Sequence, residues 1–492
     1  MIVLARKKFY ITTPIYYVND VPHIGHAYTT IAADVIARWH RLKGEDVFFL
    51  TGTDEHGEKI QQAAEKAGKE PKKFCDEIAK KFKDAWKILN ISYNHFIRTT
   101  DKYHVKAVIN ALQTLYKNGY IYKGKYQGLY CVGCEKYLTE SELIDGKCPL
   151  HLKEPQFLSE DSYFFTLSKF HTVLLNKIEK DEIVIKPEAR KNEIISFLQN
   201  NKLEDISISR SKVKWGIKLP WDESHTCYVW IDAFLNYVTG IGWPNKKFER
   251  YWPADLHLIG KDILRVHATI WPAELLAVGL KVPKQIFAHG YFTIKGQKMS
   301  KSLGNVVDPV ELSKKYSVDA VRYFLIREFP FGEDGDFSEE ALINRINGEL
   351  VADLGNLIYR VLTLAERYKG RIKGKPELDK ILDISLIDKH MENLELQDAL
   401  GAIWEFVRNT NKYINEKQVW KLEGEELSNA LYNLLEACRI ISILISPFLP
   451  ETSEKINKQL GIKAGKLKDC KFRKFTGRIK KGEYLFKKVV KM

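Results

Sequence analysis

The sequence contains few cysteines, no long apolar run and no low-complexity segment. Its 492 residues include seven cysteines, too few and too unevenly spaced for a disulfide framework, so we expect the reducing cytoplasm as its compartment. No run of about 18 apolar residues is present that could span a bilayer, and the apolar residues before Arg6 are too few for a secretory signal. Secretion and membrane insertion are therefore not expected. The 45% hydrophobic composition instead suits a folded protein of about three domains.

Basic residues are concentrated near the end of the sequence. The formal net charge is +14, and residues 461–492 alone carry 12 lysines and arginines against Asp469 and Glu483. A local excess of lysine attracts polyanions, because each neutralised phosphate releases counterions. Apolar side chains are interleaved with these charges, among them Phe472, Phe475, Tyr484, Leu485 and Phe486. We predict that they dock on the body of the protein while the lysines face a nucleic acid; a plain solvated tail is the alternative.

The first part of the chain has the pattern of a strand–helix–strand unit. Residues 9–15 are rich in strand formers, apolar residues then recur at helical spacing between 28 and 42, and a second strand is predicted at 47–50. Pro22 suits the first turn of the helix and Gly44 its end. Such a unit predicts a doubly wound parallel α/β sheet, with ligands beyond the carboxyl ends of its strands. The Gly-x-Gly-x-x-Gly fingerprint is missing from the first connection, which argues against a dinucleotide cofactor.

Two short motifs carry groups suited to phosphate chemistry. His23 and His26 flank Gly25 at the expected start of a helix, where backbone N–H groups and the helix dipole attract anions. Lys298 and Lys301 lie in a serine-containing segment between two glycines, which resembles a loop that closes over a polyphosphate. Alone, either motif could be a helix cap or a solvated surface loop. Together on one α/β sheet they favour a phosphate-binding enzyme.

These motifs resemble the signature of the class I aminoacyl-tRNA synthetases, as His-Ile-Gly-His at 23–26 and Lys-Met-Ser-Lys-Ser at 298–302. Segments 12–17, 51–57, 228–232, 258–262 and 411–420 are similar to the methionyl-tRNA synthetase branch. The resemblance implies a methionine–tRNA ligase that activates L-methionine with ATP to methionyl-adenylate and pyrophosphate. It then transfers the methionyl group to the 3′-terminal adenosine of tRNA(Met). Mg²⁺ is expected with ATP, and no covalent enzyme intermediate is expected.

The resemblance also divides the chain into six parts. A Rossmann-like catalytic domain is split between residues 1–117 and 228–290, and an acceptor-end domain with a zinc knuckle is inserted at 118–227. Residues 291–346 are expected to hold the mobile lysine loop and a stem-contact region. Residues 347–460 have the apolar stripes of a helix bundle, interrupted by Pro447 and Pro450, and correspond to an anticodon-binding domain. Residues 461–492 form the basic tail.

Binding residues follow from the resemblance by position. We expect ATP to be bound by His23, Gly25, His26, Gly260, Lys261, Asp262 and Lys301, with His23, His26, Lys298 and Lys301 as catalytic residues. A flexible thioether is well held by aromatic walls, and the expected methionine-binding residues are Ile15, Tyr17, Asp54, Trp230, Ala233, Tyr237, Ile263, His267 and Trp271. Asp54 is placed to bind the α-ammonium group. Asn356, Arg360 and Trp420 are the expected anticodon readers, through hydrogen bonds and stacking.

A metal site is predicted within the insertion. Cys131 and Cys134 form a Cys-x2-Cys pair, and Cys148 and His151 follow after 13 intervening residues. Two close ligand pairs suit one tetrahedral Zn²⁺, and four protein ligands leave no position for water, so the ion is expected to be structural. Thiols without a metal are the alternative.

Several other functions fit parts of the pattern. A synthetase for isoleucine, valine or leucine would be expected to carry a larger editing insertion, and a cysteine-specific relative would be expected to hold zinc with an open position. A non-catalytic tRNA-binding protein would not need both phosphate motifs, and a small-molecule nucleotidyltransferase would not need the bundle and the basic tail. A separate tRNA-binding subunit acting in trans stays open.

Overall fold

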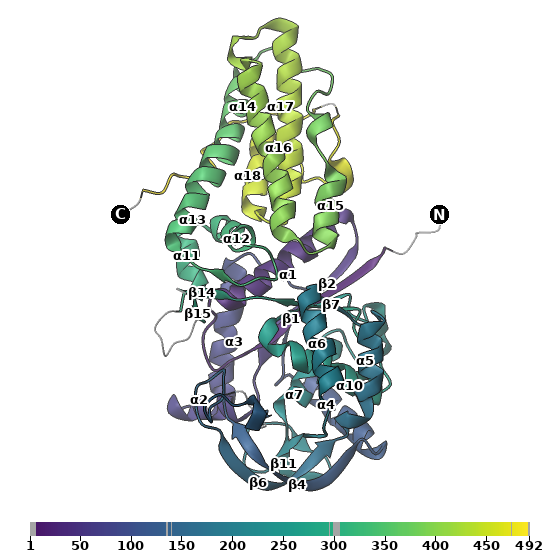
Figure 1. Ribbon diagram of the computed structural model, residues 1–492. Helices are drawn as coiled ribbons and strands as arrows, with labels where there is room; N and C mark the ends of the chain where they lie inside the picture. Colours follow the sequence, from purple (N-terminus) through teal and green to yellow (C-terminus); the bar gives the residue numbers. More distant parts are fainter. Residues whose placement is uncertain are drawn as a thin grey trace.

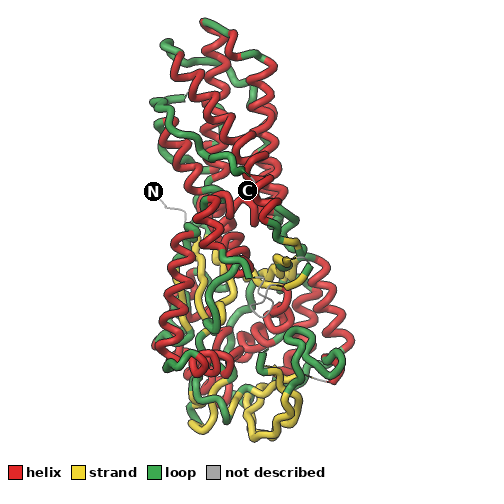
Figure 2. The backbone as a smooth tube through the Cα atoms, turned by 90° about the vertical axis from the view of Figure 1, so that its left-hand side faces the viewer, coloured by secondary structure: helices red, strands yellow, loops and turns green. Residues whose placement is uncertain are grey.

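An α/β body and a long helix bundle make up the protein, as the computed structural model shows (Figure 1). The structure describes residues 6–133, 136–138, 140–294, 296–298, 306–473 and 475–490. Strands are confined to the α/β body, whereas the bundle consists of helices and their connections (Figure 2). Among the described helices, none combines the length and the apolar character needed to cross a bilayer.

The central sheet has six parallel strands in the order β3-β2-β1-β12-β13-β7. They are β1 (Lys8–Tyr17), β2 (Asp46–Asp54), β3 (His95–Arg98), β7 (Val184–Lys186), β12 (Leu256–Gly260) and β13 (Gln285–His289). Along the chain, β2 and β3 are added on one side of β1, and β12 and β13 are added on its other side. The order therefore reverses between β1 and β12, and ligands of such sheets bind at the carboxyl ends of the strands beside this point.

Helix α1 (Ile24–Lys43) leads from β1 to β2 and is buried along most of its length. Gly44 ends it in the left-handed conformation, with φ 91°, as the sequence predicts. The prediction that Pro22 lies in the first turn is wrong, because His23 is the N-cap and the helix begins at Ile24. The side chain of His23 caps the helix, so Pro22 lies before the helix and outside its first turn.

Further helices surround the central sheet. They are α2 (Glu58–Lys66), α3 (Pro71–Ile88), α4 (Lys102–Lys117), α5 (His171–Glu179), α6 (Glu188–Asn200), α7 (Val229–Phe234), α8 (Asn236–Thr239), α9 (Leu264–Ala268) and α10 (Ile270–Ala277). Next to the body lie α11 (Pro309–Tyr316) and α12 (Val318–Arg327), with a small sheet of β14 (Phe292–Ile294), β15 (Gln297–Lys298) and β16 (Gly335–Asp336). Helix α12 contacts α1 and the bundle helix α16, so it connects the two parts of the molecule.

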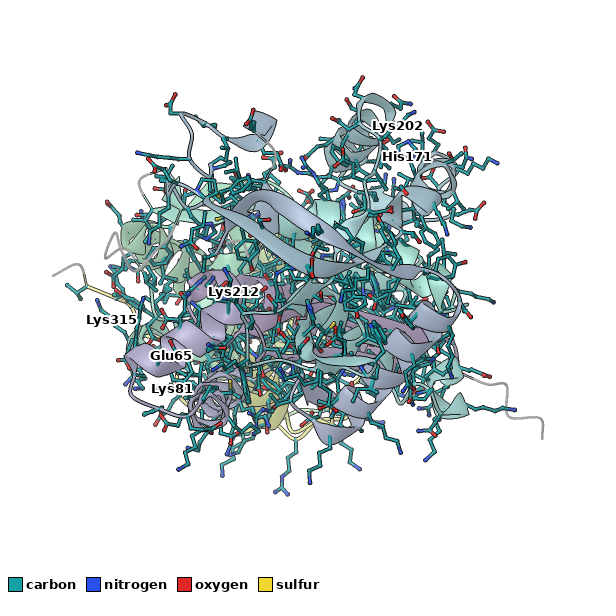
Figure 3. The ribbon with its side chains drawn as sticks, turned by 90° about the horizontal axis from the view of Figure 1, so that it is seen from below. Glu65, Lys81, His171, Lys202, Lys212 and Lys315 are labelled. Carbon is teal, nitrogen blue, oxygen red and sulfur yellow. The ribbon has the colours of Figure 1, made fainter. Side chains whose placement is uncertain are left out.

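A four-stranded antiparallel sheet lies at the far end of the body from the bundle. Its strands are β4 (Ile121–Cys131), β5 (Lys136–Leu138), β6 (Gln156–Phe165) and β8 (Ile206–Ser207), and the short strands β9 (Ser209–Arg210), β10 (Lys218–Leu219) and β11 (Asp222–Cys227) follow. Seen from below, the long β4–β6 ribbon separates His171 and Lys202 from Glu65 and Lys81 (Figure 3).

The interval predicted as the insertion, 118–227, is not structurally separate from the central sheet. Strand β7 falls inside it and pairs in parallel with β13. Ile183 and Ile185 are fully buried there, so burial of these side chains explains why the segment returns to the sheet. A three-residue strand is too short to be recognised from periodicity. The predicted boundaries at 118 and 227 themselves stay a prediction.

The bundle consists of α13 (Glu339–Arg345), a wider helical stretch Ile346–Gly355, α14 (Asn356–Arg367), α15 (Ile384–Glu392), α16 (Leu396–Glu416), α17 (Gly424–Ile445) and α18 (Pro450–Leu460). Helical conformation continues from Glu339 to Arg367, so the predicted boundary at 347 does not coincide with a helix start. Helix α17 ends before Pro447 and α18 begins at Pro450, as the proline positions predict.

The basic tail docks on the bundle, as predicted. Leu485 is buried in the large core cluster, and Phe472, Phe475 and Phe486 pack against that cluster. Tyr484 behaves differently from the prediction: 58% of its surface is exposed, and its ring stacks on Tyr359 of α14.

Candidate active site

Two stacked histidines form the start of α1. Backbone N–H of Gly25 donates to Nδ1 of His23 at 3.1 Å, and backbone N–H of His23 donates to Nδ1 of His26 at 3.2 Å. The ring centroids lie 3.8 Å apart. A Cβ on Gly25 would lie 2.9 Å from Cε1 of His23, so any larger residue at this position would displace the His23 ring. The helix start thus holds both imidazoles side by side.

The hydrogen bonds of these rings determine their protonation. Each Nδ1 accepts a hydrogen bond from a backbone N–H, so neither ring carries a proton there and the neutral form has its proton on Nε2. Burial, and to a lesser extent the neighbouring His23, hold the pKa of His26 well below its ordinary value. Neutral imidazoles at this end of α1 each offer one N–H donor, next to the positive end of the helix dipole.

The carboxyl ends of β1, β2 and β12 surround a second group of predicted residues. Ile15 and Tyr17 lie at the end of β1, Asp54 ends β2 and is 4% exposed, and Gly260 ends β12. Backbone N–H of Val18 donates to the carbonyl of Asp54 at 3.2 Å, which joins the ends of β1 and β2. Parallel pairing therefore brings these distant segments to one edge of the sheet.

Aromatic side chains of α7, α8 and α10 pack together behind this edge. The ring of Phe234 lies 5.3 Å from Trp230, 4.9 Å from His267 and 5.8 Å from Trp271. Tyr237 and Trp271 are almost fully buried, whereas Trp230 and Ile263 are half-buried. Ala233 is 5% exposed and leaves room beside the larger rings of its helix.

His267 is neutral within this cluster. Its Nδ1 donates to the carbonyl of Ile263 at 2.8 Å, so Nε2 is free of a proton and accepts from the hydroxyl of Tyr237 at 2.9 Å. Burial lowers the pKa of His267 to about 4, although the carbonyl of Ile263 and Asp262 act in the other direction. A cationic substrate group near this ring would meet no repulsion at neutral pH.

The predicted nucleotide-binding segment 260–262 begins at the last residue of β12. Lys261 forms an ion pair with Asp334, with 2.5 Å between Nζ and Oδ2, and its Nζ lies 4.9 Å from the Tyr291 ring. Lys298 lies at the end of β15, whose backbone pairs with β14, and Lys301 falls outside the described residues. Of the two lysines in the predicted phosphate clamp, the structure therefore describes only the backbone of Lys298.

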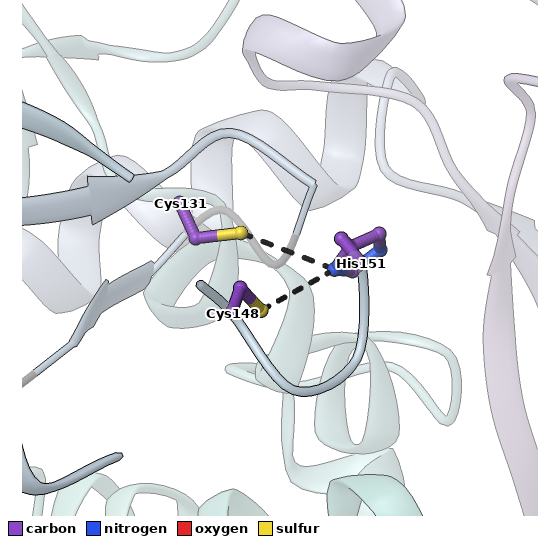
Figure 4. Close-up of side chains that lie close together, drawn as sticks. All are labelled: Cys131, Cys148 and His151. Carbon is purple, nitrogen blue, oxygen red and sulfur yellow. Dashed lines mark hydrogen bonds between the residues drawn. The ribbon is translucent and has the colours of Figure 1, made fainter. Parts of the chain in front are cut away.

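Three predicted metal ligands converge. Nδ1 of His151 lies 3.9 Å from Sγ of Cys131 and 3.8 Å from Sγ of Cys148 (Figure 4). All three ligand atoms lie within 4.8 Å of one another, and both cysteines are buried. A Cβ on Gly133 would lie 2.5 Å from the His151 ring, so glycine allows the ring to sit here. Cys134, the fourth predicted ligand, lies outside the described residues.

The predicted anticodon readers lie on the bundle. Asn356 and Arg360 are one turn apart on α14, and Nη2 of Arg360 donates to Oδ1 of Asn415 on α16 at 2.7 Å. Trp420 follows α16 and is 54% exposed. An exposed indole and partly exposed polar groups are therefore presented by neighbouring helices.

Known proteins match this chain over nearly its full length. The family model "tRNA synthetases class I (M)" matches residues 9–156 and 142–362, and the model "Anticodon-binding domain of tRNA ligase" matches residues 382–488. The methionine–tRNA ligase of Caldanaerobacter subterraneus subsp. tengcongensis is 49% identical, covering 98% of this chain and 79% of the relative. The Thermotoga maritima enzyme is 46% identical, with 98% and 80% covered.

The chain belongs to the methionyl-tRNA synthetases. A Mycobacterium tuberculosis methionyl-tRNA synthetase in complex with methionyl-adenylate has the same fold, with a TM-score of 0.93 at 40% identity, covering 98% of this chain and 99% of that one. The predicted family, the methionine–tRNA ligase activity and the fold class, a doubly wound parallel α/β sheet with a C-terminal helix bundle, are confirmed.

The synthetase structure also contains supporting residues that were not among the predicted site residues. His257 is buried behind the aromatic cluster, where its Nε2 accepts from the indole of Trp271 at 3.1 Å and its Nδ1 donates to Thr12 at 2.7 Å. Asp232 accepts from both His56 at 2.6 Å and His104 at 2.9 Å. Because Asp232 lies between Trp230 and Ala233 on α7, this network fixes the helix that carries them. Asp232 and His56 lie in segments that carry the family resemblance; His104 had no signal.

The stability of the synthetase is expected to fall below pH 6.5 through His267. Its pKa of about 4 in the folded protein lies below its ordinary value of 6.5, so between these values the unfolded chain binds more protons and stability decreases with decreasing pH. The stabilisation from the neutral His267 is fully present above pH 6.5. At about 1.4 kcal/mol per pKa unit, about 2–3 kcal/mol of it is lost when the pH falls to 4.5.

Urea unfolding at pH 7.5 and 4.5 measures this effect. The free energy of unfolding should decrease between pH 7.5 and pH 4.5 in both proteins. We expect this decrease to be about 2–3 kcal/mol smaller in His267→Gln than in the parent chain. Lys389→Gln, at an exposed position of α15, is the control and should keep the parental pH dependence, because an exposed lysine does not titrate in this range. Equal losses in the His267 variant and the parent would contradict the assignment.

Proposed function

We propose that adenylation takes place between the start of α1 and the aromatic cluster. The carboxylate oxygen of methionine attacks the α-phosphorus of ATP, a new O–P bond forms, and the bond to pyrophosphate breaks. The ribose hydroxyl of the 3′-terminal adenosine of tRNA(Met) then attacks the carbonyl carbon of the adenylate, and AMP leaves. Neither step needs a protein nucleophile, so the protein acts by positioning and by stabilising charge.

The paired neutral histidines are the observation that carries this proposal. Their Nδ1 atoms are occupied by backbone N–H groups, so the Nε2–H groups of His23 and His26 are fixed in direction before substrate binds. Donors oriented in advance stabilise charge that develops on phosphate oxygens without reorganisation during the reaction. The dipole of α1 adds attraction for the same charge.

Methionine fits the second part of the proposed site. Its α-ammonium group would pair with Asp54, while its thioether would contact the rings of Trp230, Tyr237 and Trp271. Ile15, Tyr17, Ala233 and Ile263 would complete the walls. Neutral His267 supports this assignment, because a charged imidazole would repel the ammonium group.

ATP would extend along the edge between α1 and β12. Gly25 and Gly260 allow close approach of the nucleotide, Asp262 would contact the nucleoside, and Lys261, Lys298 and Lys301 would contact the phosphates. Lys261 is held by Asp334, so its contact with a phosphate would replace this ion pair. When bound, Mg²⁺ would neutralise part of the charge on the ATP phosphates.

We assign structural Zn²⁺ to the cluster of Cys131, Cys148 and His151, with Cys134 as fourth ligand. Tetrahedral coordination with Zn–S of about 2.3 Å and Zn–N of about 2.0 Å separates sulfur from nitrogen by about 3.5 Å. The observed 3.8 and 3.9 Å are slightly longer, so a small inward shift of the three side chains would bring them to this spacing. Two thiolates and an imidazole are also ligands that zinc prefers. The ion would hold the loop after β4 against the segment before β6.

tRNA(Met) would contact the bundle through Asn356, Arg360 and Trp420, which suit splayed anticodon bases. The cytoplasm is the proposed location, because seven cysteines are too few and too unevenly spaced for a disulfide framework. A separate tRNA-binding subunit stays a prediction.

Amino-acid-dependent ATP–pyrophosphate exchange tests the proposed function. The full chain with Mg²⁺ and without tRNA should exchange with methionine and not with isoleucine, leucine, valine or cysteine. Exchange with another amino acid would contradict the methionine pocket, and no exchange by folded protein would contradict the site as a whole. Metal analysis of the same preparation should find one zinc per chain.

A further inference from the structure

The end of the tail is held on the side of the bundle that carries α14. Backbone N–H of Gly482 donates to the side chain of Gln459 at 3.0 Å. Seven residues later, Val489 exchanges two hydrogen bonds of 2.8 Å with the side chain of Asn347. In Figure 1 the tail leaves the bundle close to α13 and α14. Fixed at both ends, the segment between these anchors has a defined position.

This segment presents an aromatic ring to solvent. Leu485 is buried in the core, whereas its neighbour Tyr484 stays mostly exposed. The Tyr484 ring stacks on Tyr359 of α14 with 4.1 Å between centroids and 15° between planes, and 58% of Tyr484 stays exposed. Nζ of Lys481 lies 3.9 Å from the Tyr359 centroid.

The pair of Tyr359 and Tyr484 lies next to two of the predicted anticodon readers. Tyr359 precedes Arg360 directly and lies three residues after Asn356, so Asn356 and Tyr359 share a face of α14. The tail adds strong positive charge beside them, and Glu483 is the only acidic residue after position 469. An exposed ring and a lysine next to polar readers are the groups that bind unpaired nucleotides.

We infer that Tyr484 and Lys481 form a nucleotide site that extends the anticodon-binding surface onto the tail. An unpaired base of the anticodon loop stacks on the outer face of Tyr484, and Lys481 neutralises a phosphate of the same loop. A paired stem is a poorer fit, because its bases are already stacked on one another. This inference rests on the proposed anticodon role of Asn356, Arg360 and Trp420.

Aminoacylation kinetics of ring variants test the inference. Tyr484→Ala should raise the KM for tRNA(Met) about tenfold, the lower part of the range for loss of one stacked base, with kcat unchanged. Tyr484→Phe keeps the ring and should stay within about twofold of the parent. Methionine-dependent ATP–pyrophosphate exchange, measured without tRNA, should be unchanged in both variants.

The charge contribution has its own measurement. Lys481→Ala should reduce the slope of log affinity against log salt for tRNA by about one. Lys389→Ala is the matched control, since Lys389 is an exposed lysine on α15, on the other side of the bundle from α14 in Figure 1. Its slope should equal that of the parent.

A tRNA with abasic sugars in the anticodon loop separates stacking from a structural role. With this tRNA, the parent and Tyr484→Ala should have the same KM. The inference is overturned if Tyr484→Ala leaves the KM for intact tRNA unchanged, if its effect persists with the abasic tRNA, or if Tyr484→Phe is as impaired as Tyr484→Ala. Should Arg360→Ala also leave the KM unchanged, the anticodon assignment itself would fail.

Discussion

Replacement of His23 by asparagine is expected to reduce methionine-dependent ATP–pyrophosphate exchange by about 100- to 1,000-fold, the range for losing one oriented donor to developing charge. The asparagine oxygen can accept the N–H of Gly25, so the cap of α1 is kept. The shorter side chain then lacks the outward Nε2–H donor. The main-chain bond from residue 23 to His26 is also unchanged.

Thermal unfolding distinguishes loss of catalysis from loss of the cap. We expect His23→Asn to unfold within about 2 °C of the parent, because asparagine and aspartate are among the best N-cap residues. His390→Gln, on α15 beside the opposite end of α1 from His23, should retain parental exchange. A decrease of less than fivefold in His23→Asn, with normal stability, would show that this ring does not stabilise the transition state.

Removal of the Arg322 guanidinium is expected to lower the free energy of unfolding by about 3–5 kcal/mol, as breaking buried pairs does. Arg322 lies on α12 and is fully buried. Its Nη2 donates to Asp34 of α1 at 2.7 Å and to the carbonyl of Pro447 at 2.9 Å, and Nε donates to the carbonyl of Phe448 at 3.0 Å. One side chain therefore joins the α/β body, the connecting helix and the turn between α17 and α18.

The expected loss comes mainly from Asp34. Although burial disfavours its charged form, Arg322 and Arg38 lower the pKa of Asp34, so it is ionised in the folded protein. In Arg322→Leu this buried carboxylate loses its main partner, whereas the double variant Asp34→Leu with Arg322→Leu also removes the buried carboxylate and leaves only Arg38, which is 22% exposed, without this ion pair. The double variant should therefore be more stable than Arg322→Leu alone.

Urea unfolding of the full chain measures both variants. Arg190→Ala is the control, because Arg190 pairs with Glu193 at the surface and such pairs contribute about 0–1 kcal/mol. If Arg322→Leu changes stability no more than Arg190→Ala does, the guanidinium is not a structural connection between the body and the bundle.

Local patterns were sufficient for some parts of this site. The spacing of His23 and His26 around Gly25 placed both rings on the first turn, because the period of a helix depends only on backbone geometry. Cys131, Cys148 and His151 also came together as their spacing predicts. The end of α17 followed from Pro447, which cannot continue a helix.

Other features depended on contacts between distant residues. That α1 begins at Ile24 after a cap formed by His23, and does not include Pro22 in its first turn, was decided by a side-chain hydrogen bond. Strand β7 joined the central sheet because β13 offered an edge that buries Ile183 and Ile185. Tyr484 looked like a core residue in the sequence, yet Leu485 took the inward position and left Tyr484 exposed.

The sequence by itself determined the family, the α/β body followed by a helix bundle, the histidine pair and the cluster of Cys131, Cys148 and His151. These depend on residue type and short spacing, which act through local geometry. Only the tertiary structure decided that His257 supports Trp271, that Asp232 holds His56 and His104, and that Arg322 joins the two parts of the molecule. The physical reason is that burial and hydrogen bonding between segments far apart in the chain are set by how the elements pack, and no local pattern encodes which partner each side chain meets.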